Sequence, residues 1–332
     1  MSQPSAWDQV ISTINKHHRF TLGCHLHPDG DAIGSLLALG LSLEKTGKQV
    51  EMIVPDGVPA TYQFLPGIQR VVQQPTSRPE VVISVDCAER SRLQLPEEIF
   101  TGEPLLVNID HHISNDLFGQ VNLVLPDASA TGQLIFKLLE KGAYPIDPAI
   151  ASALYTAIAT DTGFFRYSNT TGEVLSMASK LVEEYQISPS QIAERVYEEK
   201  SYASIRLLGE VLSTLQISGN RRYSWMYLNQ EMIRKYKVEM EEIENYVNYT
   251  NSIRGVEVGL FFKEIKPDEV KISWRSKASV DVSRLAAHFG GGGHLRAAGC
   301  SMKGSLPAVM EEVLSFLSKY FEEHKDRMDG RR

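Results

Sequence analysis

The segment LLVNIDHH (residues 105–112) runs from five mostly apolar residues into an aspartate and two adjacent histidines. Its apolar part is typical of a strand that is buried on both faces, as in a parallel sheet covered by helices. Burial of three titratable groups at its end is costly unless each is paired or binds a metal ion. The segment therefore predicts a fold class and the position of a functional site.

Similar apolar, β-branched runs recur through the N-terminal half. They lie at residues 20–25, 50–55, 81–86 and 121–126. Stretches with helical spacing accompany them, at 31–47, 129–142, 148–160, 171–185 and 188–196. Strands that alternate with helices predict an α/β domain, built on a parallel sheet with helices on both faces.

The C-terminal half has a different pattern. Strand-like runs are joined by short turns, and the turn KPDE (266–269) predicts an antiparallel pair between 256–265 and 269–277. This is typical of a smaller α+β domain. The predicted organisation is a catalytic domain at 1–195, a helical connector at 196–214, an α+β domain at 215–323 and a polar tail at 324–332.

Composition excludes several classes of protein. The 332 residues carry a formal net charge of −7, which argues against tight, non-specific binding to long nucleic acid. No run of about 18 uncharged apolar residues is present, so we expect no membrane span. The three cysteines have no CxxC spacing, which favours a reducing cytoplasm.

Ionisable residues gather where the predicted strands end. HLHPDGDAIGS (25–35) follows the first strand, and VVISVD (81–86) ends on an aspartate. Open parallel sheets bind ligands beyond the carboxyl ends of their strands. Carboxylates brought together there raise one another's pKa unless cations neutralise them. Mixed oxygen and nitrogen donors favour Mn²⁺ or Mg²⁺ over Zn²⁺ or Fe²⁺, and so many donors suit two ions rather than one.

These segments resemble a known family. HLHPDGDAIGS (25–35), ISVDCAE (83–89), NIDHHISN (108–115) and TDTGFFRYSNT (160–170) resemble, in order, the four motifs of the DHH phosphoesterases. WRSKASVDVSRLAAHFGGGGHLRAAG (274–299) resembles the signature of their DHHA1 domain. The two-domain length without further modules is most similar to the NrnA-type subgroup.

The resemblance implies a ligand set for two metal ions. One ion is expected to take His25, Asp29 and Asp86. The other is expected to take Asp31, His111 and Asp161 and to share Asp86 as a bridge.

The resemblance also implies roles for residues that meet the substrate. Asp110 is expected to orient a histidine or a water molecule, and His112 to face the scissile phosphate. The glycine run can bring backbone N–H groups close to an anion, beside charged side chains. The residues expected to bind substrate are Arg275, Ser276, Gly291, Gly292, Gly293, His294, Arg166 and Asn115. Ser129 and Thr131 are expected to cap a helix rather than to contact phosphate.

The implied activity is hydrolysis of oligonucleotides of about two to five nucleotides, including linear dinucleotides such as pApA, to mononucleotides. Hydroxide held by two metal ions, most simply Mn²⁺ with Mg²⁺ as the other candidate, would attack in line. 3′-Phosphoadenosine 5′-phosphate (PAP) is a further expected substrate, and the protein is expected to form a homodimer. Length selection would arise in the cleft between the domains. A cyclic-dinucleotide phosphodiesterase, an inorganic pyrophosphatase-like enzyme and a non-catalytic nucleotide sensor remain as alternatives.

Overall fold

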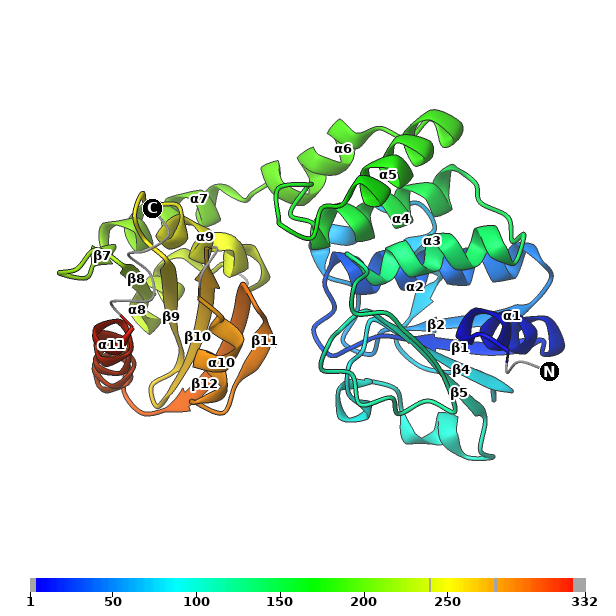
Figure 1. Cartoon of the computed structure of the whole chain (residues 1–332), viewed down its shortest axis with the longest axis horizontal. Coiled ribbons are helices and arrows are strands. Elements are labelled where there is room, and N and C mark those ends of the chain that lie inside the picture. Colours follow the sequence, from blue (N-terminus) through cyan, green and yellow to red (C-terminus); the bar gives the residue numbers. More distant parts are fainter. Residues whose placement is uncertain (1–3, 239, 278–279, 325–332) are drawn as a thin grey trace. The chain divides into compact units, whose positions relative to one another are not determined.

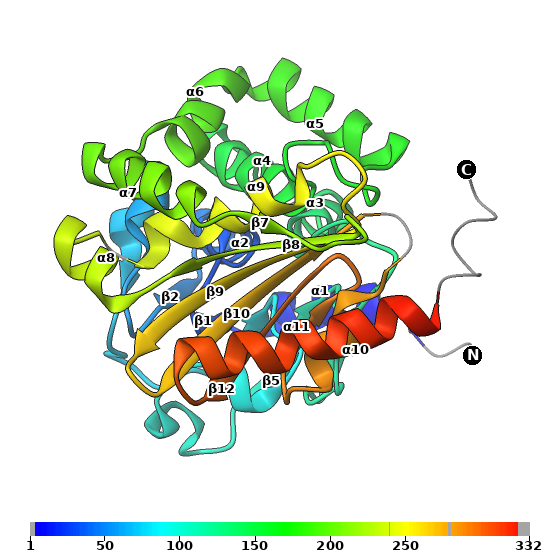
Figure 2. The same cartoon turned by 90° about the vertical axis from the view of Figure 1, so that its left-hand side faces the viewer.

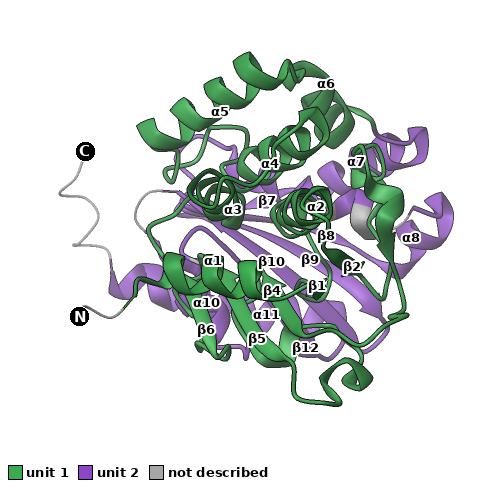
Figure 3. Ribbon diagram, turned by 90° about the vertical axis from the view of Figure 1, so that its right-hand side faces the viewer, with its two compact units in different colours: residues 1–199 green, residues 200–332 purple. Residues whose placement is uncertain are grey.

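The computed structural model describes residues 4–238, 240–277 and 280–324. The chain divides into two compact units, residues 1–199 and 200–332 (Figure 3). Each unit has a hydrophobic core of its own. In the part of the chain that the structure describes, no helix combines the length and the apolar composition that crossing a membrane requires.

Unit 1 is built on a six-stranded sheet in which every pair of neighbours is parallel (Figure 1). The strands are β1 (Arg19–Gly23), β2 (Gln49–Ile53), β3 (Val71–Val72), β4 (Val81–Val85), β5 (Leu105–Asp110) and β6 (Val121–Val124). Their order across the sheet is β3-β2-β1-β4-β5-β6. The central strand β4 is buried along its whole length, which explains its unbroken run of apolar and small residues.

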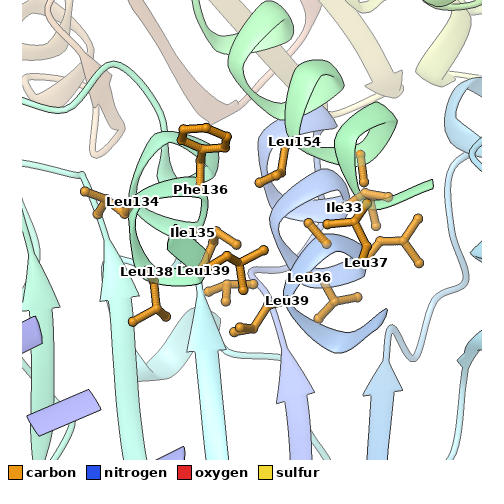
Figure 4. Close-up of a cluster of buried hydrophobic side chains, with 14 of the residues drawn as sticks. Ile33, Leu36, Leu37, Leu39, Leu134, Ile135, Phe136, Leu138, Leu139 and Leu154 are labelled. Atoms are coloured by element: carbon orange, nitrogen blue, oxygen red, sulfur yellow. The ribbon is translucent and has the colours of Figure 1, made fainter. Parts of the chain in front are cut away.

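Long helices supply the main core of unit 1 on one face of the sheet. The helices of the unit are α1 (Ala6–Lys16), α2 (Gly30–Lys45), α3 (Thr131–Lys141), α4 (Pro148–Asp161), α5 (Gly172–Tyr185) and α6 (Pro189–Ala193), followed by the π-turn η5 (Glu194–Glu198). Figure 4 shows apolar side chains of α2, α3 and α4 filling the space between these helices. A Cβ on Gly34 would collide with the Ala153 carbonyl, so this glycine lets α2 and α4 approach closely.

The opposite face of this sheet is covered by a smaller apolar cluster from short 3₁₀ turns and loops, including Leu93, Leu95 and Ile99. The 3₁₀ turns of unit 1 are η1 (Ala60–Tyr62), η2 (Ile68–Arg70), η3 (Arg90–Arg92) and η4 (Glu97–Phe100).

The two crossovers that leave the middle of the sheet run in opposite directions. From β1 the chain passes through α2 to β2, and from β4 it passes through η3 and η4 to β5 on the other side. The order of the strands therefore reverses between β1 and β4. In open parallel sheets, ligands bind at such a switch point, beyond the carboxyl ends of the strands.

Unit 2 has a mixed six-stranded sheet in the order β11-β12-β10-β9-β8-β7, with only β8 and β9 paired in parallel. Its strands are β7 (Gln216–Ile217), β8 (Tyr223–Leu228), β9 (Val258–Lys266), β10 (Glu269–Ser276), β11 (Gly292–His294) and β12 (Ala297–Lys303). Its helices are α7 (Tyr202–Ser213), α8 (Gln230–Tyr236), α9 (Val247–Asn251), α10 (Val282–Ala287) and α11 (Leu306–Glu323), with the 3₁₀ segment η6 (Met240–Tyr246).

The sheet of unit 2 carries helices on both faces. Leu260 and Phe262 of β9 pack into one cluster with α10 and α11, whereas Phe261 packs into another with α7, α8 and α9. Alternate residues of a strand point to opposite faces, so the three consecutive apolar residues of β9 serve two cores. Figure 2 shows α11 lying across the strands of this sheet.

The predicted α/β class with a smaller second domain is confirmed. The antiparallel pair predicted across the KPDE turn is also confirmed, as β9 and β10. The sequence pattern predicts no element at 6–16, where α1 forms, or at 230–255, where α8 and α9 form. The glycine run at 290–293 is expected to form an anion-binding loop, whereas its last two glycines begin strand β11.

Candidate metal centre and nucleotide-binding residues

Ionisable side chains from separate segments of unit 1 meet at the switch point between β1 and β4. His25 follows β1, Asp86 follows β4, and β5 ends on Asp110 and continues into the two histidines. Asp29 is the N-cap of α2, and Asp161 is the last residue of α4. The cluster therefore combines strand ends and helix ends that lie far apart in the sequence.

One group of possible ligands consists of His25, Asp29 and Asp86, whose ligand atoms lie within 4.8 Å of one another. His25 Nε2 is 3.9 Å from Asp29 Oδ1 and 3.5 Å from Asp86 Oδ2. The Asp86 backbone has a φ of 55°, a left-handed conformation that aspartate adopts more readily than most residues. These three residues are those predicted for the first ion.

A second group consists of Asp31, His111 and Asp161. His111 Nε2 lies 3.7 Å from Asp31 Oδ2, 3.5 Å from Asp161 Oδ2 and 3.7 Å from Asp86 Oδ1. The two carboxylate oxygens of Asp86 thus face different groups. A third set of donors within the same limit joins Asp86, His111 and His112.

Hydrogen bonds fix the orientation of the two histidine rings that enter these groups. His25 Nδ1 lies 2.8 Å from the Leu26 carbonyl, and His111 Nδ1 lies 3.1 Å from the Ala128 carbonyl. A carbonyl only accepts, so each Nδ1 carries a proton, and Nε2 is the ring nitrogen that is left to bind a metal ion. Histidines that bind metal ions are commonly held in this way.

The carboxylates of the cluster repel one another because they are buried together. Burial raises the pKa of Asp31 well above its usual value, and the charge of Asp86 raises it further. Burial and the charge of Asp29 likewise raise the pKa of Asp161. Burial alone would lower the pKa of His25, but hydrogen bonds to Asp29 and Asp86 raise it to about 11. Divalent cations would relieve this repulsion, so the donor set and its charge fit bound metal ions.

The helix α3 holds the carboxylates in place. Backbone N–H groups of Thr131 and Gly132 donate to the two oxygens of Asp31 at 2.6 and 2.8 Å. The Thr131 hydroxyl donates to Asp86 Oδ1 at 3.0 Å, and its side chain is fully buried. The prediction that Ser129 and Thr131 cap this helix is wrong, because the N-cap is Ala130 and no side chain caps the helix. Threonine is common near the start of a helix, so the sequence gives no sign that the Thr131 hydroxyl binds Asp86.

A second network surrounds Asp110. His112 Nδ1 lies 2.7 Å from Asp110 Oδ1, and the Asn115 amide donates to Asp110 Oδ2 at 2.6 Å. The same amide donates to the side chain of Asn108, a buried residue in the middle of β5. Burial would lower the pKa of His112, but the bond to Asp110 and nearby carboxylates raise it to about 9. Asp110 therefore orients His112, and the structure places the Asn115 amide against Asp110.

Known proteins share the two domains of this chain. The sequence profile of the DHH family, N-terminal domain, matches residues 19–158, and that of the DHHA1 domain matches residues 224–323. The "bifunctional oligoribonuclease and PAP phosphatase NrnA" of Thermus thermophilus is 33% identical to the chain over 298 residues, which are 88% of this chain and 87% of that protein. The chain belongs to the DHH family.

Other DHH-family relatives agree over nearly the whole length. The NrnA protein of Bacillus subtilis is 27% identical over 320 residues, covering 96% of this chain and 99% of that protein. The crystal structure of an exopolyphosphatase-related protein from Bacteroides fragilis superposes with a TM-score of 0.88 at 28% identity, covering 98% and 97% of the two chains. The chain is therefore a phosphoesterase of the DHH family, a family of enzymes that use divalent metal ions.

The DHHA1 domain brings the predicted substrate-binding residues to one end of its sheet. Arg275 of β10 and His294 of β11 both pair with Ala297 of β12, from opposite sides. Neighbouring strands are about 4.8 Å apart, so this row of three residues is roughly 10 Å wide. The side chain of His294 lies outside the described part of the structure. Arg275 is half-buried, and its Nη1 donates to the Trp274 carbonyl at 3.0 Å.

The other residues of the DHHA1 domain that were expected to bind substrate mostly contact backbone atoms near that row. Ser276 is buried, and its hydroxyl donates to the Val280 carbonyl at 2.7 Å. A Cβ on Gly291 would collide with the Gly299 carbonyl, and Gly293 has a φ of 141°. By contrast, a Cβ on Gly292 would meet nothing within 4 Å. Two of the three predicted glycines thus lie too close to β12 for a side chain, and Gly292 faces open space.

Arg166 lies in unit 1, after a turn in which Gly163, Phe164 and Phe165 all have left-handed φ angles of 57°, 54° and 63°. Arg166 is exposed, its Nε donates to the Gly163 carbonyl at 2.6 Å, and its guanidinium lies 5.8 Å from the ring centre of Tyr197. Consecutive left-handed residues are strained and occur at functional sites. Arg166 therefore lies in the turn that directly follows α4 and its last residue, Asp161.

Proposed function

We propose that this phosphoesterase hydrolyses very short oligonucleotides, including linear dinucleotides such as pApA, to mononucleotides, and converts PAP to AMP. The observation that carries the proposal is the pair of donor groups joined by Asp86 at the switch point of the sheet. The names of the NrnA relatives, which match almost end to end, support the choice of substrate.

The proposed cofactor is a pair of Mn²⁺ ions. His25 and Asp29 would hold one ion, Asp31, His111 and Asp161 the other, and Asp86 both. Carboxylate oxygens with only two imidazoles suit Mn²⁺ better than thiolate-preferring metals. When bound, two such ions activate water and neutralise the charge that develops on a phosphoryl group.

The side chains of the chain itself would then orient the substrate and move a proton. His112 is held through Nδ1 by Asp110, which Asn115 in turn holds. A proton given to the substrate would leave from Nε2, and Asp110 would stabilise the charged ring throughout. In other enzymes, too, a carboxylate orients a catalytic imidazole and stabilises its charged form.

Recognition of the far end of the substrate is proposed for unit 2. Arg275, at the end of β10, and the backbone of β11 would supply the donors that a terminal phosphate or second nucleotide requires. We also propose a homodimer, on the resemblance alone, and a cytoplasmic location. The three cysteines are buried and unpaired, as is usual in a reducing compartment.

A kinetic panel tests the proposal. The substrates are 5′-phosphorylated oligonucleotides of increasing length, PAP, cyclic dinucleotides and pyrophosphate, each with Mn²⁺. We expect kcat/KM to be highest for dinucleotides, to fall steadily with length, and to be negligible for pyrophosphate. Preference for pyrophosphate or for cyclic dinucleotides would overturn the substrate assignment, and binding of nucleotides without turnover would indicate a sensor.

Arg275→Ala is the matched variant for the same panel. Loss of a charge-assisted contact is typically worth about 1.5–3 kcal/mol, so KM for dinucleotides should rise about tenfold or more. Hydrolysis of bis-p-nitrophenyl phosphate, which has no second nucleotide, should hardly change. If both substrates were affected alike, Arg275 would support the fold rather than recognise substrate.

A further inference from the structure

A pocket of about 360 Å³ lies in unit 1 among residues that none of the roles above uses. It is lined by Leu26, Pro55 and residues 91–96. Pro55 follows the carboxyl end of β2, and Leu26 follows that of β1 by three residues. The pocket therefore lies at the same edge of the sheet as the metal cluster, which is where ligands of such sheets bind. Its size falls in the range of small-molecule sites.

Hydrogen bonds connect the wall of this pocket directly to a metal-binding segment. The Leu26 N–H donates to the Arg92 carbonyl at 2.9 Å, and the Gln94 N–H donates to the Cys24 carbonyl at 3.4 Å. Between these two bonds, His25 and Leu93 face each other as an antiparallel bridge. A residue of the wall is thus the immediate neighbour of a proposed metal ligand.

The chemistry of the pocket suits a flat, largely apolar group that is attached to an anion. Leu26, Pro55, Leu93 and Leu95 supply apolar surface, and the surface of the pocket is mainly apolar. Arg92 is exposed at its rim, and its guanidinium forms no hydrogen bond or ion pair with any residue among those described. A guanidinium can stack on a nucleobase or bind phosphate.

Apart from Arg92, the polar side chains of the lining already donate a hydrogen bond to a carboxylate. The side-chain amide of Gln94 donates to Asp56 Oδ2 at 2.8 Å, and the Ser91 hydroxyl donates to Glu89 Oε2 at 3.2 Å. Contacts through apolar surface and stacking tolerate any base, because every base has a π-face.

We propose that this pocket, the base pocket, holds the nucleobase and ribose of the nucleotide whose phosphate meets the metal cluster. Arg92 stacks on that base or contacts its phosphate. The proposal rests on the proposed function, since it assumes a nucleotide substrate, and it adds a subsite in unit 1 with little base preference. Degradation of short RNA of every sequence requires such tolerance.

Photo-crosslinking locates the base directly. The full-length protein is irradiated with 8-azido-AMP in the presence of Mn²⁺, and the modified peptides are identified by mass spectrometry. We expect modification within residues 91–96 or at Leu26 or Pro55, and competition by unmodified AMP. Modification confined to other segments would overturn the proposal. This readout needs no turnover, so it remains decisive even if the protein hydrolyses no oligonucleotide and the proposed function fails.

A blocking substitution tests the same pocket by kinetics. Ser91 is exposed, so Ser91→Trp should fill the pocket without disturbing the core, and Ser179→Trp on α5 is the matched control. The substrates are pApA and two analogues, each lacking one of the two bases. Ser91→Trp should raise KM for pApA about tenfold and leave KM unchanged for one abasic analogue, with normal Mn²⁺ content. An equal loss on all three substrates, or no loss on any, would contradict the proposal.

Discussion

At the scale of single residues, Asp86 connects the two groups of metal-binding side chains. Its carboxylate faces His25 with one oxygen and His111 with the other, and its backbone adopts a left-handed conformation to do so. The hydroxyl of Thr131 donates to the oxygen on the His111 side. Mutation of a residue that orients a metal ligand typically costs about 10- to 100-fold in metal affinity or activity.

Thr131→Val should therefore weaken metal binding while leaving the fold intact. Valine has almost the same shape as threonine, and the backbone N–H that binds Asp31 remains. Affinity for Mn²⁺ should fall about 10- to 100-fold. The Mn²⁺ concentration at half-maximal activity and the bound metal per chain provide the measurement. Thr131→Ser, which keeps the hydroxyl, should restore both values. Wild-type affinity in the valine variant would show that Thr131 does not position Asp86.

The two adjacent histidines should respond differently to substitution. His111→Ala removes a ring that faces three carboxylates and should lower metal content. His112→Ala removes the ring that Asp110 holds, so metal content should stay near normal while kcat falls about 10²- to 10⁴-fold. Metal analysis and steady-state kinetics on the same preparations separate the two effects. Equal metal loss in both variants would mean that His112 is a ligand, as the third donor group permits.

The sequence predicted which residues would gather but not what each side chain would touch. His25, Asp29, Asp31, Asp86 and Asp161 end separate strands or border helices, so parallel-sheet topology alone places them together. The orientation of side chains depends on tertiary neighbours. The bond from Asn115 to Asp110 and the bond from Ser276 to Val280 are of this kind, and neither could be foreseen from spacing.

At the scale of elements, the glycine run has two functions that the sequence could not separate. Gly291 and Gly293 allow β11 to lie close against β12, where a Cβ would meet backbone atoms. Gly292 has no such constraint. A run of four glycines is typical of a flexible anion-binding turn, so the sequence predicted a loop where the partner strand β12 imposes a strand.

Two alanine substitutions should separate these functions. Gly291→Ala should cost about 1–3 kcal/mol of unfolding free energy, because the methyl group collides with the Gly299 carbonyl. Gly292→Ala should leave Tm almost unchanged and raise KM for dinucleotides, since its methyl group would project into the space where the phosphate is proposed to bind. Thermal unfolding and kinetics of both variants provide the measurement. Unchanged KM in a stable Gly292→Ala variant would argue that β11 does not contact substrate.

At the scale of the whole molecule, the metal cluster couples stability to pH. Without metal ions, the folded protein retains protons on Asp31, Asp161, His25 and His112, whose pKa values are all raised. The unfolded chain releases these protons at lower pH, with histidine at about 6.5. The stability that these groups contribute is therefore present at low pH. For the two histidines it is lost as pH rises through about 9 for His112 and about 11 for His25.

Metal ions should reverse this trend, because they bind the deprotonated ligands. The rise in Tm on adding Mn²⁺ to the EDTA-treated protein should grow between about pH 6.5 and about pH 8.5. Calorimetry with and without Mn²⁺ across this range provides the measurement, and Ca²⁺ serves as a comparison of ion preference. A gain in Tm that is independent of pH would mean that the cluster is not the site of binding.

Six side chains are proposed to hold two metal ions, with Asp86 between them. Anomalous diffraction at the manganese edge, from crystals grown with Mn²⁺, locates such ions without any assumption about activity. We expect two peaks about 3.5–4 Å apart, one beside His25 and Asp29 and the other beside Asp31, His111 and Asp161, with Asp86 bound to both. A single peak, or two peaks of which only one contacts Asp86, would contradict the proposal.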